Sequence, residues 1–331
     1  MMPSFFQGRV QWTHLALCAC GIVLGAFGTF LWYEPEESDL NPGCLRAYPL
    51  LRPDLDCTSA DADYARIERI QDEVTMLIEQ EKASGAITRA SVFVRDLTTR
   101  RYAKINPEEH YITGSLLKLP LAIAYYKFGE LDGSILEQTF RYNAPSLGYR
   151  IEEWLPKKSL VPGVAYSTED MIAQMLQESD NEAAQLLEER IDHAFFLKVI
   201  SDLGISMPED FDLTKNFVTV ESYAAMFRSL YLSSYLNIDH SQHLLQLLSE
   251  ASFSEGIKAG VPEEVIVAHK FGDREIVDTR TGSEVTAQLH DCGIVYKPNH
   301  PYLLCIMTEG AQHDRLPGVI ARISALVYAL E

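Results

Sequence analysis

Positive charge is scarce in this sequence, and its scarcity excludes one class of partner. The 331 residues include 28 Lys and Arg against 47 Asp and Glu, a formal net charge of −19. A protein that binds nucleic acid needs a basic face for the phosphates. We therefore expect no nucleic-acid partner, whereas the net charge says nothing about the fold.

Signatures of metals and cofactors are also missing. No CxxC pair and no HExxH helix occurs, so the common zinc motifs are absent from the sequence. His240 and His243 have a spacing that suits a metal on a helix, but such a pair more often marks a polar helix face. We therefore predict neither a metal nor a cofactor.

Long uncharged runs are absent with one exception, "LALCACGIVLGAFGTFLWY" at 15–33, which is nineteen residues long. This length spans a bilayer core, and the final Trp-Tyr pair suits the interface. Arg9 precedes the run and acidic residues follow it, which predicts cytoplasmic residues 1–14 and an extracytoplasmic remainder. A cleaved signal peptide and a lipoprotein signal ending at Cys20 are the alternatives; we favour an uncleaved anchor.

Cysteines are few, and their positions follow the same division. Two of the six lie inside the apolar run. Cys44 and Cys57 flank part of an acidic, proline-containing tether at 34–59, where an oxidising compartment would favour a local disulfide. Cys292 and Cys305 lie on two expected strands that face one another in one arrangement, and we favour the interpretation that they are buried free thiols.

Internal repeats and low-complexity tracts are lacking, and the sequence predicts one domain at residues 60–331. The periodicity predicts a helix from Ala60, two strands, a helical block at about 131–260, three strands joined by short turns, and a final helix. We therefore predict an α+β fold in which an antiparallel sheet is flanked by the N- and C-terminal helices, with an all-helical subdomain. We expect a monomer.

Three short motifs appear in a suggestive order. "SLLK" places Ser115 three residues before Lys118, "SDN" spans Ser179–Asn181, and "KFG" occurs at Lys127–Gly129 and again at Lys270–Gly272. An S-x-x-K match is expected about once by chance in a chain of this size, and an S-D-N match in roughly one chain of twenty. S-x-x-K and K-x-G are uninformative alone, and S-D-N is the rarer match. The order of the three motifs and their places in the expected elements carry the information.

Each motif has a simpler interpretation. Ser115 opens an expected helix and fits the role of its cap. Ser179 lies between two helices, where turn residues are common, and Lys270 ends an expected strand, where a lysine is often solvated. All three simple interpretations would require three coincidences in the right order. We therefore favour a catalytic interpretation.

From about Ala60 to Glu331 the chain resembles the class A β-lactamases and their transpeptidase and carboxypeptidase relatives. In these penicillin-recognising serine enzymes the S-x-x-K, S-D-N and K-T-G elements occupy such places. "SDNEAAQLL" and "HDCGIVY" add to the resemblance. It implies the fold described above and an acyl-enzyme mechanism on a β-lactam or a cell-wall peptide amide.

The resemblance also implies roles that the chemistry supports. Ser115 would be the nucleophile and Lys118, on the same helix face, its base. A lysine acts as a base near neutral pH only where burial or a second cation, here Lys270, lowers its pKa. Ser179 would relay a proton to the leaving nitrogen.

Substrate binding would fall to the residues beside these four. Asn181 would hold the amide of the substrate. Gly272 and Asp273 continue the K-x-G element, and the backbone N–H groups of Ser115 and Asp273 would form the oxyanion hole.

Two departures from the family pattern weaken the expectation of efficient β-lactam turnover. The segment 204–219 is too short for the family's omega-shaped loop, and the deacylating glutamate cannot be assigned to Glu209, Asp210 or Asp212. Phe271 replaces the hydroxyl residue of K-T-G, whose hydroxyl helps to bind the substrate carboxylate. We expect slow deacylation.

The second departure also affects charge at the site. Asp273 would repel an anionic substrate. Either the substrates lack the usual carboxylate, or that group is bound elsewhere, and Arg274 is one candidate for binding it. The leading hypothesis is thus a membrane-anchored extracytoplasmic serine hydrolase. A D,D-peptidase-like enzyme with little β-lactam turnover, a non-catalytic binder of wall fragments or β-lactams, and a structural membrane protein without a site are the alternatives.

Overall fold

Helix α3 (Ala60–Ala83) opens the part of the chain that the computed structural model describes, which is residues 60–143, 156–210, 212–277 and 284–331. Ile67, Ile70, Val74 and Ile78 are buried along one side of this helix, at the spacing that places side chains on one face. They belong to a core cluster that also contains the apolar face of the C-terminal helix α11 (Leu316–Leu330). The prediction of helices at both ends of the domain is confirmed.

A five-stranded antiparallel sheet carries this cluster on one face, with the strand order β2-β1-β7-β6-β5. Alternating side chains point to opposite faces, so each strand contributes to two cores. The strands are β1 (Arg89–Asp96), β2 (Tyr102–Ile105), β5 (Val267–Val277), β6 (Glu284–Val295) and β7 (Tyr302–Gly310). The predicted antiparallel sheet is confirmed.

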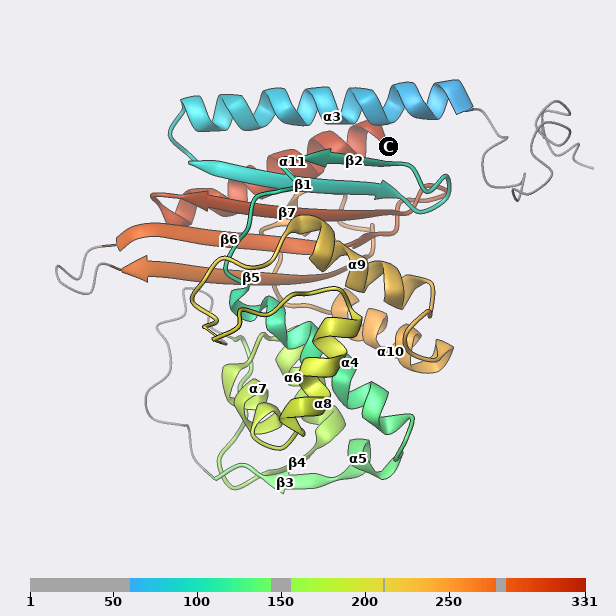
Figure 1. Ribbon diagram of the computed structural model, residues 1–331, viewed down its shortest axis with the longest axis vertical. Helices are drawn as coiled ribbons and strands as arrows, with labels where there is room; N and C mark the ends of the chain where they lie inside the picture. The colour runs from blue at the N-terminus through green and yellow to red at the C-terminus, as the bar shows by residue number, and fades with distance from the viewer. Residues whose placement is uncertain (1–59, 144–155, 211, 278–283) are drawn as a thin grey trace, which may run out of the picture. The chain divides into compact units, whose positions relative to one another are not determined.

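A mostly helical block packs on the other face of the sheet through a second cluster of buried residues. Figure 1 shows most of this block beyond edge strand β5, on the side away from α3. Its helices are α4 (Lys118–Gly129), α5 (Ser134–Glu137), α6 (Thr168–Gln177), α7 (Asn181–Glu188), α8 (His193–Asp202), α9 (Val220–Tyr231) and α10 (Ile238–Ser249).

The helical subdomain contains one feature that was not predicted. Strands β3 (Thr139–Arg141) and β4 (Ala165–Ser167) pair as a two-stranded antiparallel ribbon, so the subdomain is not all-helical. Three residues are too few to show an alternating pattern, so these strands could not be predicted from periodicity. Ser167 at the end of β4 caps α6 in a capping box with Asp170, as its sequence indicates.

The prediction of free thiols at Cys292 and Cys305 is wrong. The register of β6 and β7 sets these residues directly opposite one another, and they form a disulfide with 13 residues of sequence separation. Cys292 is also the cross-strand partner of Lys270 on β5. The disulfide therefore joins two central strands beside the predicted site.

Within the described residues, no helix is long and apolar enough to cross a bilayer. The predicted anchor at 15–33, the tether at 34–59 and the Cys44–Cys57 pair lie outside those residues. By internal contacts the chain divides at Ala60, and Asp61–Glu331 forms one compact unit.

Candidate active site

Ser115 lies in a short 3-10 helix, η2 (Gly114–Leu117), which runs directly into α4. Its side chain is buried, with 6% of the residue's surface exposed. Thr113 and Leu117 occupy the N-cap positions of η2 and α4. Ser115 is therefore not the cap of this helix, and the simpler interpretation of "SLLK" is wrong.

Two glycines allow η2 and strand β5 to touch through their backbones. Gly114 has a φ of +50°, and a Cβ there would lie 2.4 Å from the carbonyl oxygen of Asp273. A Cβ on Gly272 would lie 2.7 Å from the carbonyl oxygen of Thr113 and 2.8 Å from the backbone nitrogen of Leu116. Real Cβ atoms do not approach so closely, so both positions require glycine. This contact brings the backbone next to the serine against the backbone of β5.

The residues just before η2 are fixed by three hydrogen-bonded contacts. Tyr111 pairs with Val218 in an isolated antiparallel bridge, with its N–H 2.8 Å from the carbonyl oxygen. The N–H of Ile112 donates to Oε1 of Gln288 at 2.9 Å, and its carbonyl oxygen accepts from Nε2 of His290 at 2.9 Å. Strand β6 thus supports the segment that leads into Ser115.

Gln288 and His290 were missed by the sequence analysis, although polar residues at alternating positions of an apolar strand were a signal. Burial lowers the pKa of His290 to about 4, so the ring is neutral near pH 7 and Nε2 carries the proton that Ile112 accepts. Gln288 is fully buried and donates to Oδ1 of Asn216 at 3.1 Å and to Oε2 of Glu309 at 2.6 Å.

Lys118, Ser179 and Lys270 meet at a single hydroxyl. Nζ of Lys118 and Nζ of Lys270 each lie 3.0 Å from Oγ of Ser179. Lys118 also donates to the carbonyl oxygen of Ser179, and Lys270 to that of Phe271 at 2.9 Å. All three site side chains are buried. Three elements far apart in the sequence, α4, the α6–α7 turn and β5, are joined at this point.

Ser179 adopts an unusual backbone conformation. Its φ is +56°, in the left-handed region that non-glycine residues rarely occupy. The next residue, Asp180, is buried and caps α7 by accepting from the N–H groups of Glu182 at 2.8 Å and Ala183 at 3.1 Å. Asn181 is the first residue of α7 and is half-buried. The capped turn presents the Ser179 hydroxyl to both lysines.

Strand β5 corrects two expectations about the K-x-G element and the residue after it. Lys270 lies inside a strand that continues to Val277, rather than at its end, because pairing with β6 continues beyond it. The Phe271 ring packs on Phe253, with 4.2 Å between centroids, and Lys270 Nζ lies 4.2 Å above it. The ring is therefore enclosed in the core and supports Lys270.

The alternation of side chains along β5 also determines the face of the sheet to which the Asp273 side chain points. This side chain shares the Phe271 face, whereas Gly272 and Arg274 share the Lys270 face. The carboxylate of Asp273 therefore lies on the opposite face from the Ser179 hydroxyl, contrary to the expectation that it stands in the substrate's path. Burial raises the pKa of the Asp273 carboxyl, although the charges of His313, Lys270 and Lys118 oppose that rise.

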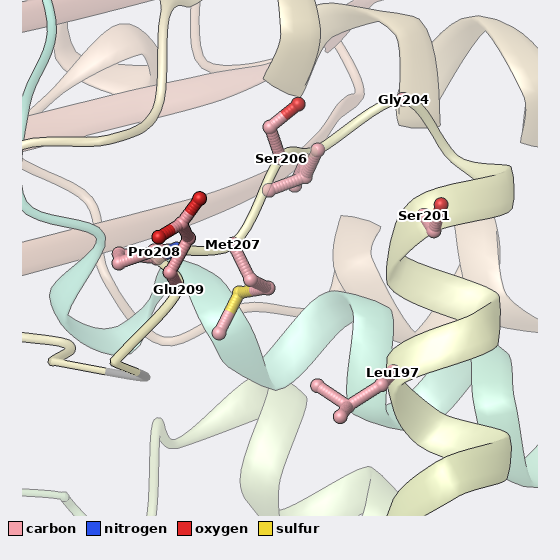
Figure 2. Close-up of a pocket in the computed structure, with 8 residues that line it drawn as sticks. Leu197, Ser201, Gly204, Ser206, Met207, Pro208 and Glu209 are labelled. Atoms are coloured by element: carbon pink, nitrogen blue, oxygen red, sulfur yellow. The ribbon is translucent and has the colours of Figure 1, made fainter.

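The segment before α9, residues 204–219, is the one that the sequence shows to be too short for the omega-shaped loop of the family. Its first residues and the end of α8 line a surface pocket of about 360 Å³. Figure 2 shows Leu197 and Met207 extending into the pocket, while the carboxylate of Glu209 is turned away from Leu197. None of the eight residues that line it is a predicted site residue. This pocket is separate from the Lys118–Ser179–Lys270 arrangement.

The other two acids of this segment, exposed Asp210 and half-buried Asp212, are engaged with neighbours close in sequence. Asp210 forms an ion pair with Lys215, which lowers the pKa of its carboxyl. Asp212 accepts from the hydroxyl of Thr214 at 2.5 Å and from its N–H at 3.0 Å, and the pKa of its carboxyl is lowered too.

The two histidines with metal-like spacing lie on α10 and face carboxylates of other elements. Nε2 of His243 lies 3.1 Å from Oε1 of Glu169, and Nδ1 of His240 lies 3.7 Å from Oε1 of Glu130. In the part of the chain that the structure describes, no group of three or more His, Cys, Asp or Glu side chains is arranged to hold a metal.

Comparisons with known proteins bear on the family and on the fold. The model of the beta-lactamase enzyme family matches residues 69–330. None of the curated proteins matches the chain.

Solved structures share the fold over most of the chain. PBP-A, which has also been solved as an acyl-enzyme complex of a variant with penicillin G, has a TM-score of 0.63 at 18% identity over 79% of this chain and 95% of its own. A β-lactamase from Chitinophaga pinensis has a TM-score of 0.63 at 20% identity, covering 79% and 98%. A class A β-lactamase from Bacteroides cellulosilyticus has a TM-score of 0.64 at 19% identity, covering 79% and 98%.

Proposed function

The chain belongs to the beta-lactamase enzyme family, and from this premise we propose that it is a membrane-anchored, extracytoplasmic serine hydrolase acylated at Ser115. Its substrate is a β-lactam or a peptide amide of the cell-wall type. The observation that carries this proposal is the Ser179 hydroxyl, which lies 3.0 Å from Nζ of Lys118 and 3.0 Å from Nζ of Lys270.

Two lysines close to one hydroxyl favour a neutral amine at one of them, and a neutral amine can act as a base. Because each Nζ lies 3.0 Å from the same oxygen, the two nitrogens are at most about 6 Å apart, where like charges repel strongly in a buried site. This repulsion favours the loss of a proton from one of them. Lys118, one turn after Ser115, is the amine that we assign as the base.

Acylation then follows a short sequence of bond changes. Ser115 Oγ loses its proton to Lys118 and attacks the carbonyl carbon, whose oxygen becomes negative and accepts from the N–H groups of Ser115 and Asp273. The close approach of Gly114 to Asp273 supports this oxyanion hole. The C–N bond breaks as the nitrogen takes a proton from the Ser179 hydroxyl, which is replenished from the lysines. Asn181, next to that hydroxyl, holds the substrate amide.

Slow deacylation is the second part of the proposal. It requires that no carboxylate activates water beside the ester of Ser115. The engagement of Asp210 with Lys215 and of Asp212 with Thr214 supports this, and so does the position of Glu209 at a separate pocket. The protein would therefore accumulate as an acyl-enzyme with a penicillin.

The membrane placement rests on the sequence. The uncharged run at 15–33, with Arg9 before it and acids after it, supports an anchor with residues 1–14 in the cytoplasm. Release of the protein from membranes by detergent, but not by high salt, is the expected result; release by salt alone would contradict an anchor.

Intact-mass spectrometry of the full chain with benzylpenicillin tests the enzymatic proposal. We expect the wild-type protein to gain the mass of one intact penicillin, and the adduct to persist after free drug is removed. Ser115→Ala should show no adduct, because it lacks the nucleophile. Ser167→Ala, which alters a serine at the cap of α6, serves as the matched control and should acylate normally.

Three other outcomes have distinct meanings. Rapid loss of drug without an adduct would contradict slow deacylation and indicate efficient turnover. An adduct on Ser115→Ala would contradict the assigned nucleophile. Absence of both adduct and drug loss would contradict acylation by β-lactams.

A further inference from the structure

Arg274 carries a positive charge that the mechanism above does not use. It lies on edge strand β5, is half-buried, and has no hydrogen-bond or ion-pair partner among the described residues. Most of the other cations near the site are engaged: Lys118 and Lys270 bind Ser179, and Arg89 binds Glu109 and Glu309. A half-buried guanidinium without a partner costs solvation, and an anion that binds it would offset that cost.

On its own face of the sheet, Arg274 lies beside a neutral residue, and the acid beyond that residue, Glu309, is paired with Arg89. The cross-strand neighbour of Arg274 is Gln288, whose amide is bound to Asn216. The acids next to it in sequence, Asp273 and Glu275, lie on the opposite face by strand alternation. An anion at Arg274 therefore meets no carboxylate of the same face from β5.

The direction along β5 places Arg274 relative to the reacting bond. Lys270 and the Ser179 hydroxyl lie on one side of Asp273, and Arg274 follows Asp273 on the other side. In the proposed mechanism the Ser179 side receives the leaving nitrogen, and Asp273 N–H receives the carbonyl oxygen. The strand beyond Asp273 therefore runs beside the acyl part of the substrate.

We propose that Arg274 forms a subsite for an anionic group on the acyl part of the substrate. The inference rests on the acylation of Ser115 proposed above and narrows its substrate class to acyl donors that carry a carboxylate on that side. The guanidinium binds this carboxylate through two parallel N–H···O contacts, which lysine cannot reproduce. No bond of the substrate is made or broken there.

A matched pair of penicillins tests this subsite. Benzylpenicillin and α-carboxybenzylpenicillin differ by one carboxylate on the acyl side chain. We expect Arg274→Ala in the full chain to lower the second-order acylation rate constant for the α-carboxy compound about tenfold to a hundredfold relative to that for benzylpenicillin. Arg274→Lys should retain an intermediate preference. The ratio of the two constants cancels any general loss of folded protein.

Arg69→Ala is the control for net charge. Arg69 is exposed on α3, where it pairs with Glu73 and packs on no site element, so its removal should leave the ratio unchanged. An unchanged ratio in Arg274→Ala, or an equal change in Arg69→Ala, would overturn the subsite while leaving acylation intact. If the wild type is acylated by neither penicillin, the proposed function fails and the subsite fails with it.

Discussion

The backbones of Gly114 and Asp273 lie so close together that adding one methyl group at Gly114 should destabilise the protein. Gly114→Ala places a Cβ 2.4 Å from a carbonyl oxygen at a φ of +50°. We expect the free energy of unfolding to fall by about 2–5 kcal/mol, combining the left-handed backbone cost with overpacking. Urea unfolding measures this loss, and acylation of Ser115 should slow with it.

Gly85→Ala separates the two contributions. Gly85 has a φ of +72°, but a Cβ there meets no atom within 4 Å. Only the backbone cost of about 1–2 kcal/mol should appear. Equal losses of unfolding free energy in the two variants would mean that β5 moves to accommodate the added methyl group. The close approach of Gly114 to Asp273 would then not determine the position of Ser115.

Among single residues, the sequence identified those that would react with the substrate, but not those that hold the backbone before Ser115 in place. Motif order identified Lys118, Ser179 and Lys270, which the fold brings to one hydroxyl. Gln288 and His290 remained unnoticed because their partners, the backbone groups of Ile112, lie more than 170 residues away. Contacts of this kind depend on how two elements cross, which local patterns do not encode.

At the scale of elements, strands β6 and β7 are joined by a disulfide whose removal should be costly. Cys292 and Cys305 are fully buried, and they close a loop with a sequence separation of 13. In the chain-entropy model such a link contributes about 3 kcal/mol by restricting the unfolded chain. We expect the double variant Cys292→Ala, Cys305→Ala to lose about 2–4 kcal/mol of unfolding free energy in urea.

Thiol counting supplies the independent check on that link. In denaturant without reductant, Cys292 and Cys305 should resist alkylation, and reduction should expose both. Alkylation of both before reduction would show free thiols. An unchanged unfolding free energy in the double variant would show that the link adds nothing to the paired strands.

Elements were predictable where a long pattern repeats. Helix α3 and strand β1 show periodicity in their apolar residues and β7 is a continuous apolar run, whereas β3 and β4 have three residues each and show no pattern. The continuation of β5 past Lys270 was missed because the strand becomes polar at "DREI". The pairing of Cys292 with Cys305 follows from the register of β6 and β7, and a shift of one residue between these strands would have placed the two thiols on opposite faces.

At the scale of the whole molecule, one buried histidine predicts how stability changes with pH. Burial holds the pKa of His290 at about 4, and its Nδ1 has no hydrogen-bond partner in the described part of the chain. Above pH 6.5 the ring is neutral in both folded and unfolded chains, so it adds no pH dependence. Between pH 6.5 and 4, His290 binds a proton in the unfolded chain but not in the folded chain. The free energy of unfolding should therefore fall over this window, by up to about 3 kcal/mol.

His290→Gln isolates this effect, because an amide can still donate to Ile112 but does not titrate. Urea unfolding at several pH values should give a shallower pH dependence for this variant than for the wild type, with the difference confined to the window between pH 6.5 and 4. Carboxyls whose pKa the fold lowers, such as Asp96 and Glu309, act at the acid end of the window in both proteins and cancel in the comparison. His300→Gln, at an exposed position, should behave as the wild type. Parallel curves for His290→Gln and wild type would mean that His290 is protonated in the folded protein, and that the Ile112 carbonyl is held beside Ser115 by a charged ring.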